Sequence, residues 1–189
     1  MKAYQNERRE NIIAYLAKRH RMALGEAPYQ THIYKYLGMF EYRCLRELGY
    51  LPLGYTYRAM ENGPVPEELY FNRTSLKTEH FEFRSAGEGK YTVHPVRDAD
   101  LDYFSEDELE ILNKLILQLT RRKRESRTAH FSERSHEEIR AWREAWQRQE
   151  NSIMNPDDEF ADLDSVREGE RSPAELHYSI EKVLHGSRR

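Results

Sequence analysis

The chain has 189 residues, which is enough for one well-cored domain with an appendage. Its 30 lysines and arginines stand against 33 aspartates and glutamates, and the net charge of −3 disfavours a protein whose main partner is nucleic acid. Cys44 is the only cysteine, which excludes an internal disulfide and a cysteine-based zinc site, and its apolar helical surroundings indicate a buried thiol. The N-terminal stretch has no signal-like apolar core and no segment approaches about eighteen apolar residues, so we expect a soluble, cytoplasmic protein without membrane contact.

Two helices are predicted before residue 50. Asn6 can cap the first helix, and the segment 25–28, with its glycine and proline, ends it. From Gln30 onward apolar residues step by three or four until Gly49, which suits the end of a helix. Gly38 lies inside this second helix, where glycine costs about 1 kcal/mol relative to alanine, so we expect a closely packed neighbour there.

The central stretch, residues 53–70, is interpreted as a strand, a rigid corner and a helix. Alternating side chains over 55–60 are typical of a short strand. The tetrapeptide 63–66, Gly-Pro-Val-Pro, has two prolines that fix φ and remove two N–H donors, so we expect a stiff corner that neither a helix nor an inner strand absorbs. Pro66 suits the first turn of a following helix, which carries two glutamates at its positive end. The corner holds no nucleophile and no general base, so we interpret it as scaffold.

A β-hairpin is predicted after this helix. Residues 80–84 and 90–94 alternate apolar and polar side chains, and the glycine-rich segment 86–89 connects them. Because an isolated hairpin is only marginally stable, we expect the strand at 55–60 to join it or helices to cover one of its faces.

The most apolar helix follows a capping box. Ser105 and Glu108 are spaced to satisfy each other's backbone N–H groups, and the helix that they open carries leucines and isoleucines on one face. This helix should be the core helix. It ends in the basic run 121–127, which is either a solvated helix end or a patch for phosphate or an acidic partner.

Two further segments complete the pattern. Ser135 and Glu138 have the spacing of a second capping box, ahead of Trp142 and Trp146, which are typical of a core or an interface. Residues 155–171 are acidic and without periodicity, so we interpret them as a linker; their aspartates lack the spacing of a calcium loop.

A last short helix begins at Ser172 and has an apolar side that either docks back on the domain or faces a partner. The predicted organisation is an N-terminal helix (1–28), a central domain (29–155) and an acidic linker with a C-terminal helix (156–189). The predicted fold class is α+β: a mainly α-helical single domain with a small antiparallel sheet.

Catalytic and metal-binding patterns are not visible in the sequence. The eight histidines show no paired ligand spacing, and no phosphate-binding loop, dinucleotide turn or nucleophile elbow is present. His136 beside Glu137 could act as a general base, but a histidine satisfied at a helix start is the simpler interpretation. We therefore expect no enzyme, no cofactor and no metal.

An ordered set of residues has the spacing of one known family. It comprises Lys35, Glu41, Gly49, Gly54, Tyr57, Gly63, Pro64, Val65, Pro66, Leu69 and Tyr70, then 104–109 (FSEDEL), and then 132–142 with Ser135, His136 and Trp142. From about residue 30 to residue 155 the chain thereby resembles the Panacea domain, the family of SocA-like antitoxins. Gly38 and Met39 depart from a Tyr-Phe pair of the family pattern, and the acidic segment and last helix are additions.

The resemblance implies an antitoxin of a bacterial toxin–antitoxin system, often of phage or prophage origin, that neutralises a cognate toxin by direct binding. SocA itself delivers its toxin to a protease, so a protease is a second implied partner. Abundant tyrosine, tryptophan and arginine agree with a protein-binding role.

The exposed side of the helix at 33–48 is our candidate partner surface. Tyr34, Tyr42, Arg43 and Arg46 lie there in the predicted helix, where large amphipathic side chains could anchor a partner. The alternative is that the tyrosines pack on the domain's own sheet.

The rival function is a winged-helix DNA-binding regulator. The helix at 33–48 followed by a hairpin imitates a recognition helix and wing, and Arg43, Arg46 and Lys90 could contact phosphates. Glu41 and Glu47 on the same helix argue against it, and we expect no specific nucleic-acid binding.

Overall fold

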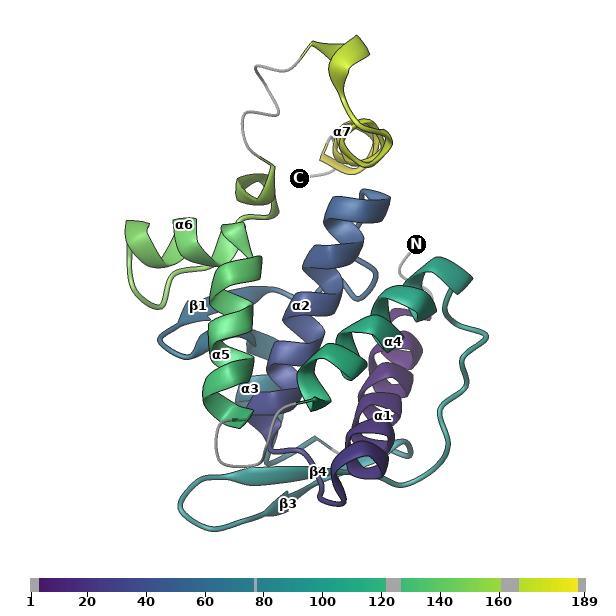
Figure 1. The fold of residues 1–189 in the computed structure, drawn as a ribbon, viewed down its shortest axis with the longest axis vertical. Coiled ribbons are helices and arrows are strands. Elements are labelled where there is room, and N and C mark those ends of the chain that lie inside the picture. Colours follow the sequence, from purple (N-terminus) through teal and green to yellow (C-terminus); the bar gives the residue numbers. More distant parts are fainter. Residues whose placement is uncertain (1–3, 77, 122–126, 161–166, 187–189) are drawn as a thin grey trace.

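The computed structural model describes residues 4–76, 78–121, 127–160 and 167–186, and within them the fold is α+β and mainly helical, as predicted (Figure 1). None of the helices in these ranges is long and apolar enough to cross a bilayer. The helices are α1 (Gln5–Leu24), α2 (Gln30–Leu48), α3 (Glu67–Asn72), α4 (Glu106–Thr120), α5 (Arg127–Glu138), α6 (Arg140–Arg148) and α7 (Pro173–Gly186), with short 3-10 turns η2 (Pro156–Glu159) and η3 (Glu168–Glu170). The strands are β1 (Tyr57–Met60), β2 (Gly63–Pro66), β3 (Phe81–Ser85) and β4 (Tyr91–Pro95), and they form two separate antiparallel pairs.

Helix α2 is the centre of the molecule. It runs between α5 on one side and α4 with α1 on the other, and it also contacts β2 and α7 (Figure 1). Fourteen of its 19 residues are buried, so the apolar stripe read from the sequence is only one part of a helix that is covered nearly all round. The predicted end is confirmed: Gly49 has φ +84° and its N–H donates to the carbonyls of Cys44 and Leu45. Cys44 is buried, also as predicted.

Helix α1 begins differently from the prediction. Asn6 does not cap it; the helix starts at Gln5, after Tyr4 in a left-handed conformation, and no side chain caps it. Contacts with distant residues hold this end instead, because Gln5 Nε2 and Arg9 Nε both donate to the Leu53 carbonyl at 2.8 Å. The predicted stop is confirmed at Gly25, which has φ +75°.

The segment 63–66 is extended and forms the edge strand β2, so it belongs to a hairpin and is more than the corner that the sequence predicted, although it is no inner strand. Met60 pairs with Gly63 and Tyr57 with Pro66, so β1 and β2 form a hairpin with a two-residue turn. The prolines fit because they lie opposite residues 57 and 59, whose backbone groups bond to residues 151–154 on the other edge of β1. No N–H is therefore required of either proline. The predicted helix after Pro66 is α3.

The second hairpin is the predicted one. Phe81 pairs with Pro95 and Phe83 with Val93, with the glycine-containing turn between the strands. Strand β1 does not join it; α1 covers the hairpin instead, and the Val93 N–H donates to the Pro28 carbonyl. Of the two arrangements expected, helical cover is the one observed.

Helix α4 has the capping box that the sequence predicts. The Ser105 hydroxyl accepts from the Glu108 N–H at 3.2 Å, and the Glu108 carboxylate accepts from the Ser105 N–H at 2.8 Å. Its buried face consists of Ile111, Leu112, Leu115, Ile116 and Leu119. Most of the basic run that follows lies outside the described residues.

The second predicted capping box, by contrast, is wrong. Ser135 and Glu138 belong to the last turn of α5, where the Ser135 hydroxyl donates to the Ser132 carbonyl at 2.8 Å. Ile139 is extended and separates α5 from α6. The start of α6 is held from a distance, since the Ala141 N–H donates to the Glu159 carboxylate at 2.8 Å.

Residues 156–160, read from the sequence as part of a linker, are packed. Glu159 is 6% exposed and forms an ion pair with Arg46, and Phe160 packs on Tyr178 of α7. Helix α7 docks on the end of α2, where His177 Nδ1 lies 2.6 Å from the Leu48 carbonyl oxygen. Residues 161–166 lie outside the described ranges.

Gly38→Ala tests the contact between α2 and β2. A Cβ at this position would lie 2.7 Å from Pro64 Cγ and 3.1 Å from Pro64 Cβ. The gain in helix propensity is about 1 kcal/mol, and we expect overpacking to outweigh it and lower the free energy of unfolding by about 1–3 kcal/mol net. Urea denaturation measures the change. Gly169→Ala is the matched control, because nothing lies within 4 Å of its Cβ position; a Gly38→Ala protein that is as stable as the parent would contradict the close contact.

Candidate functional site

Five of the family-motif residues, spread over more than a hundred positions, meet at one place. Lys35 comes from α2, Gly63 from β2, Ser135 and His136 from α5 and Trp142 from α6; we call this group the Lys35 cluster. Gly63 is its geometric centre. A Cβ on Gly63, which has φ +114°, would lie 2.5 Å from Ser135 Oγ, 3.2 Å from Lys35 Cε and 3.6 Å from His136 Cδ2. The absent side chain of glycine is what lets the other three side chains converge.

Lys35 carries its charge into the interior. Its side chain is 2% exposed, and among the described residues none forms an ion pair or hydrogen bond with its ammonium. Burial lowers the pKa of Lys35 from 10.5 to about 8, so most molecules still hold a buried positive charge at pH 7. A buried charge without a counter-ion normally costs folding free energy.

His136 lies against the indole of Trp142. The two rings are stacked, with centroids 3.8 Å apart and planes 5° from parallel, and Trp142 Nε1 donates to the Met60 carbonyl at 3.1 Å. Burial and then the Lys35 ammonium lower the pKa of His136, so the ring is neutral at pH 7. His136 Nε2 is buried and has no hydrogen-bond partner in the described part of the chain. His136 therefore lies at the end of a helix, not at a helix start as interpreted from the sequence, and only one side of its ring is satisfied.

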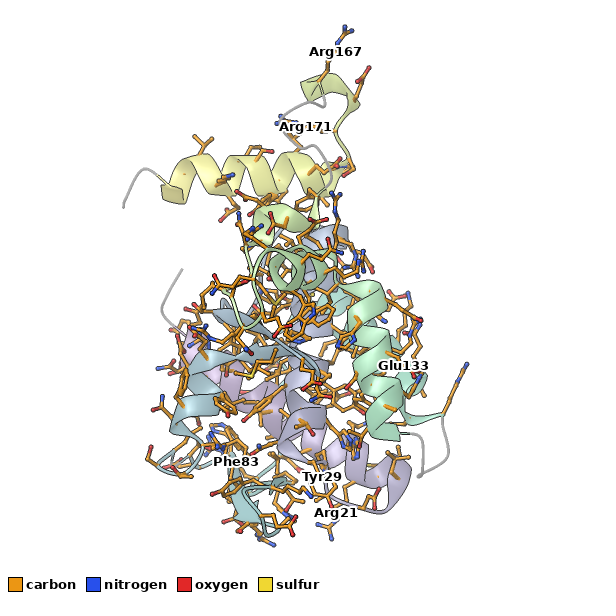
Figure 2. All side chains as sticks on the ribbon, turned by 90° about the vertical axis from the view of Figure 1, so that its left-hand side faces the viewer. Arg21, Tyr29, Phe83, Glu133, Arg167 and Arg171 are labelled. Carbon is orange, nitrogen blue, oxygen red and sulfur yellow. The ribbon has the colours of Figure 1, made fainter. Side chains whose placement is uncertain are left out.

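The cluster does not have the geometry of a nucleophile with its base. The Ser135 hydroxyl donates to the Ser132 carbonyl, within its own helix, and is not aligned on His136. Glu133 of α5, labelled in Figure 2, acts on His136 only through its charge, which raises the pKa of His136 and is the smallest of the influences on it. Within the described residues no group of three histidine, cysteine, aspartate or glutamate side chains is placed to hold a metal ion.

A second group of motif residues shapes the fold beside this cluster. Glu41 Oε1 accepts hydrogen bonds from the N–H groups of Leu53 and Gly54, at 2.9 and 2.6 Å, which ties the entry to β1 onto α2. Burial raises the pKa of Glu41 to about 7, although both backbone donors act in the opposite direction. Tyr57 is buried next to this carboxylate, and Gly54 needs its positive φ of 58°. These residues position β1 and, through it, the hairpin that carries Gly63.

The two candidate tyrosines for partner binding are buried, so the expectation of an exposed side with Tyr34 and Tyr42 was wrong. Each is 1% exposed, because β1, β2 and α3 cover this side of α2. Tyr34 packs edge-on against Tyr70, and Tyr42 against Tyr57. The alternative stated from the sequence, packing within the domain, is the observed arrangement.

The two candidate arginines form ion pairs within the chain. Arg43 binds Glu138 with two nitrogens, one of them at 2.7 Å, and it also donates to Gln118. Arg46 bonds to both Glu138 and Glu159, and its side chain is 31% exposed. These bonds link α2, α5 and η2, and a role of either arginine in partner binding stays a prediction.

The recognition helix of a winged-helix protein must be free to enter a DNA groove. Here the helix that would serve, α2, is the central buried helix, and Arg43 and Arg46 are engaged with carboxylates. The structure therefore does not support the DNA-binding alternative.

The sequence left open whether the apolar side of the last helix, α7, docks on the domain or faces a partner. Four of its apolar residues, at positions i, i+4, i+7 and i+8, are exposed, and α7 lies across one end of the molecule (Figure 2). A row of this kind is typical of a helix that meets a protein partner. The exposed fractions are 37% for Leu176, 49% for Ile180, 71% for Val183 and 59% for Leu184.

Comparison with known proteins identifies the family. Residues 33–143, well over half of the chain, match the family described as antitoxin SocA-like, Panacea domain. The chain is therefore an antitoxin-like protein, and it belongs to the SocA-like Panacea family. The matched range begins within α2 and ends within α6, so it contains the whole Lys35 cluster. A family of antitoxins points to a non-enzymatic role and, in general, to a toxin as partner. No curated protein and no solved structure matches the chain.

Lys35→Met tests whether the buried ammonium destabilises the fold. Methionine keeps the length and the apolar contacts, so we expect the free energy of unfolding at pH 7 to rise by about 1–3 kcal/mol. Because the pKa is lowered on folding, the unfolded chain binds more protons between pH 8 and 10.5, and the stability of the parent should rise with pH across that window. The variant should lack this rise.

Denaturant unfolding at pH 7 and pH 10 provides the measurement. Lys114→Met is the control, since that lysine is 62% exposed and should change stability little. A Lys35→Met protein that is clearly less stable than the parent at pH 7 would show that the ammonium is stabilised by the fold.

Proposed function

We propose that this protein is the antitoxin of a toxin–antitoxin pair and neutralises its cognate toxin by binding it directly. The observation that carries the proposal is the match to the SocA-like Panacea domain, whose motif residues form the packed frame around α2. The ion-paired arginines and the Ser135 hydroxyl, which is bonded within α5, offer no reaction chemistry that would support an enzymatic alternative.

Direct binding needs a surface, and α7 offers the best one. Its docked side contacts the end of α2 and η2, and its other side leaves four apolar residues exposed. Apolar residues in one row can enter a groove of a partner, and burying them would supply the association free energy. Arg46 lies at the same end of α2, where α7 docks, so it can join the rim of this surface.

The proposed setting is the bacterial cytoplasm, with the gene pair carried by a bacterial, phage or prophage genome. A protease that removes the bound toxin, as with SocA, would be a further component of the same complex. Simple binding requires the antitoxin in proportion to the toxin, whereas an adaptor is released once the toxin is degraded and can be used again.

Co-expression with the neighbouring reading frame tests neutralisation. We expect the neighbour alone to stop growth, and growth to return when this protein is produced in at least equal amount. A complex of the two proteins should co-purify, and its stoichiometry can be measured by light scattering. Rescue at strongly substoichiometric levels with an unchanged toxin half-life, or a covalently altered toxin in its mass spectrum, would contradict neutralisation by binding. Toxin half-life with and without the antitoxin separates simple binding from delivery to a protease.

Charge placed on the α7 surface should weaken the complex. Ile180→Glu introduces a carboxylate where an apolar contact is proposed, and we expect at least a tenfold loss of toxin affinity, about 1.4 kcal/mol. Leu117→Glu on α4 is the matched control, because Leu117 has a similar exposure of 53% and lies on another helix. Calorimetry of both variants against the toxin, with their melting curves, gives the result. Equal affinities for the two variants would place the interface elsewhere.

A further inference from the structure

In the described part of the chain, the buried carboxylates each have a cation or a backbone N–H group as partner. Glu108 is 1% exposed and pairs with Arg8 at 2.6 Å, and the buried Glu159 pairs with Arg46. Glu41 has two backbone donors. Lys35 differs, because in the described ranges no carboxylate or other acceptor meets its ammonium. The interior therefore contains a cation whose counter-ion does not come from these residues.

A second unfilled polar atom lies beside this cation. His136 Nε2 is buried without a partner, while the other side of the ring is held by the Asn62 backbone and by the stack on Trp142. Lys35 Cε and His136 Cδ2 lie 3.2 and 3.6 Å from one point, the position of the missing Cβ of Gly63. The two side chains are therefore neighbours across Gly63.

The cluster lies just beneath the surface. The two turn residues that precede Gly63, Glu61 and Asn62, are exposed, and His136 is itself only half-buried. Trp142, held by its bond to Met60, forms a fixed wall.

We propose that Lys35 and His136 form a binding site for a carboxylate. A single negative charge matches the single positive charge that Lys35 supplies while His136 is neutral. The carboxylate accepts from the Lys35 ammonium and, once His136 takes up a proton, also from its Nε2. If the chain is an antitoxin, as proposed above, the natural source is an acidic side chain of the toxin that inserts beside the turn at residues 61–62.

The first arm of the test needs no toxin. Thermal unfolding of the full chain is measured at pH 7.5 in sodium formate, the smallest carboxylate, and in sodium chloride at the same ionic strength. We expect formate at about tenfold over its dissociation constant to raise the melting temperature by about 3 °C. Lys35→Met should show no difference between the two salts, and Lys114→Met should behave like the parent.

The second arm uses the complex with the toxin. A carboxylate beside Lys35 and His136 favours their protonated forms, so binding at pH 8 should take up protons. Calorimetry in two buffers of different ionisation enthalpy measures this uptake. We expect Lys35→Met to reduce proton uptake and to weaken toxin binding at least tenfold, while its melting temperature in the free state is no lower than that of the parent.

The outcomes distinguish a free carboxylate from an acidic group of the toxin, and they distinguish failure of the binding site from failure of the antitoxin function. A formate effect alone assigns the site to a free carboxylate, and lost proton uptake assigns it to an acidic group of the toxin. No formate effect together with toxin binding that Lys35→Met leaves unchanged overturns the site, although the antitoxin function would stand. If the neighbouring protein does not bind at all, the proposed function fails and the formate arm alone decides on the site.

Discussion

The close approach of α2 to the β1–β2 hairpin is the constraint on which the rest of the structure depends. Gly38 lets Pro64 lie against the helix, and Gly63 lets side chains from α2 and α5 meet above the strand. Both contacts need a residue without a Cβ, and both fall on a strand whose prolines hold its shape. Once the hairpin is fixed there, its outer edge bonds to residues 151–154, which brings the chain after α6 back across the domain.

Polar groups then lock the helices around this centre. Glu138 at the end of α5 binds both Arg43 and Arg46 of α2, and Glu159 joins Arg46 to the start of α6. These bonds are partly or fully buried, where an arginine–carboxylate pair with two hydrogen bonds fixes geometry more firmly than an exposed pair does. Arg43 and Arg46, the candidate partner anchors of the sequence analysis, therefore stabilise the contacts among the helices. Helix α2 belongs to the interior of the domain more than to its surface.

The sequence predicted those parts of the fold that local chemistry decides. The end of α2 at Gly49, the Ser105 capping box and the hairpin at residues 80–94 follow from glycine, side-chain caps and alternation, and each is observed. The errors occurred where distant contacts decide. The prolines of β2 are tolerated because β1 turns its other backbone groups toward residues 151–154, and α6 starts on a carboxylate 18 positions away. Neither partner can be found in a local window.

For the candidate site, too, the sequence predicted local features but not the contacts between distant residues. The family spacing predicted Lys35, Gly63, Ser135, His136 and Trp142 as a set, but not that they touch, nor that Lys35 is buried without a counter-ion. Helical periodicity placed Tyr34 and Tyr42 on a face but could not show that β1, β2 and α3 cover that face. An apolar stripe indicates that a helix packs against something; it does not say how many of its sides are covered.

The regions outside the family match are built into the same frame. Gly49 ends α2. Because it has no side chain, the backbone of Ala174 can approach it closely, so α7 packs on the last turn of α2. Asp157 accepts from Tyr178 at 2.6 Å and from Lys182 at 2.6 Å, which holds α7 to the 3-10 turn that carries Glu159. Glu159 continues these contacts through Arg46 to Glu138 at the end of α5, the helix that also carries His136. Hydrogen bonds and ion pairs through η2, α2 and α5 therefore join the docked helix to the helix that carries part of the Lys35 cluster.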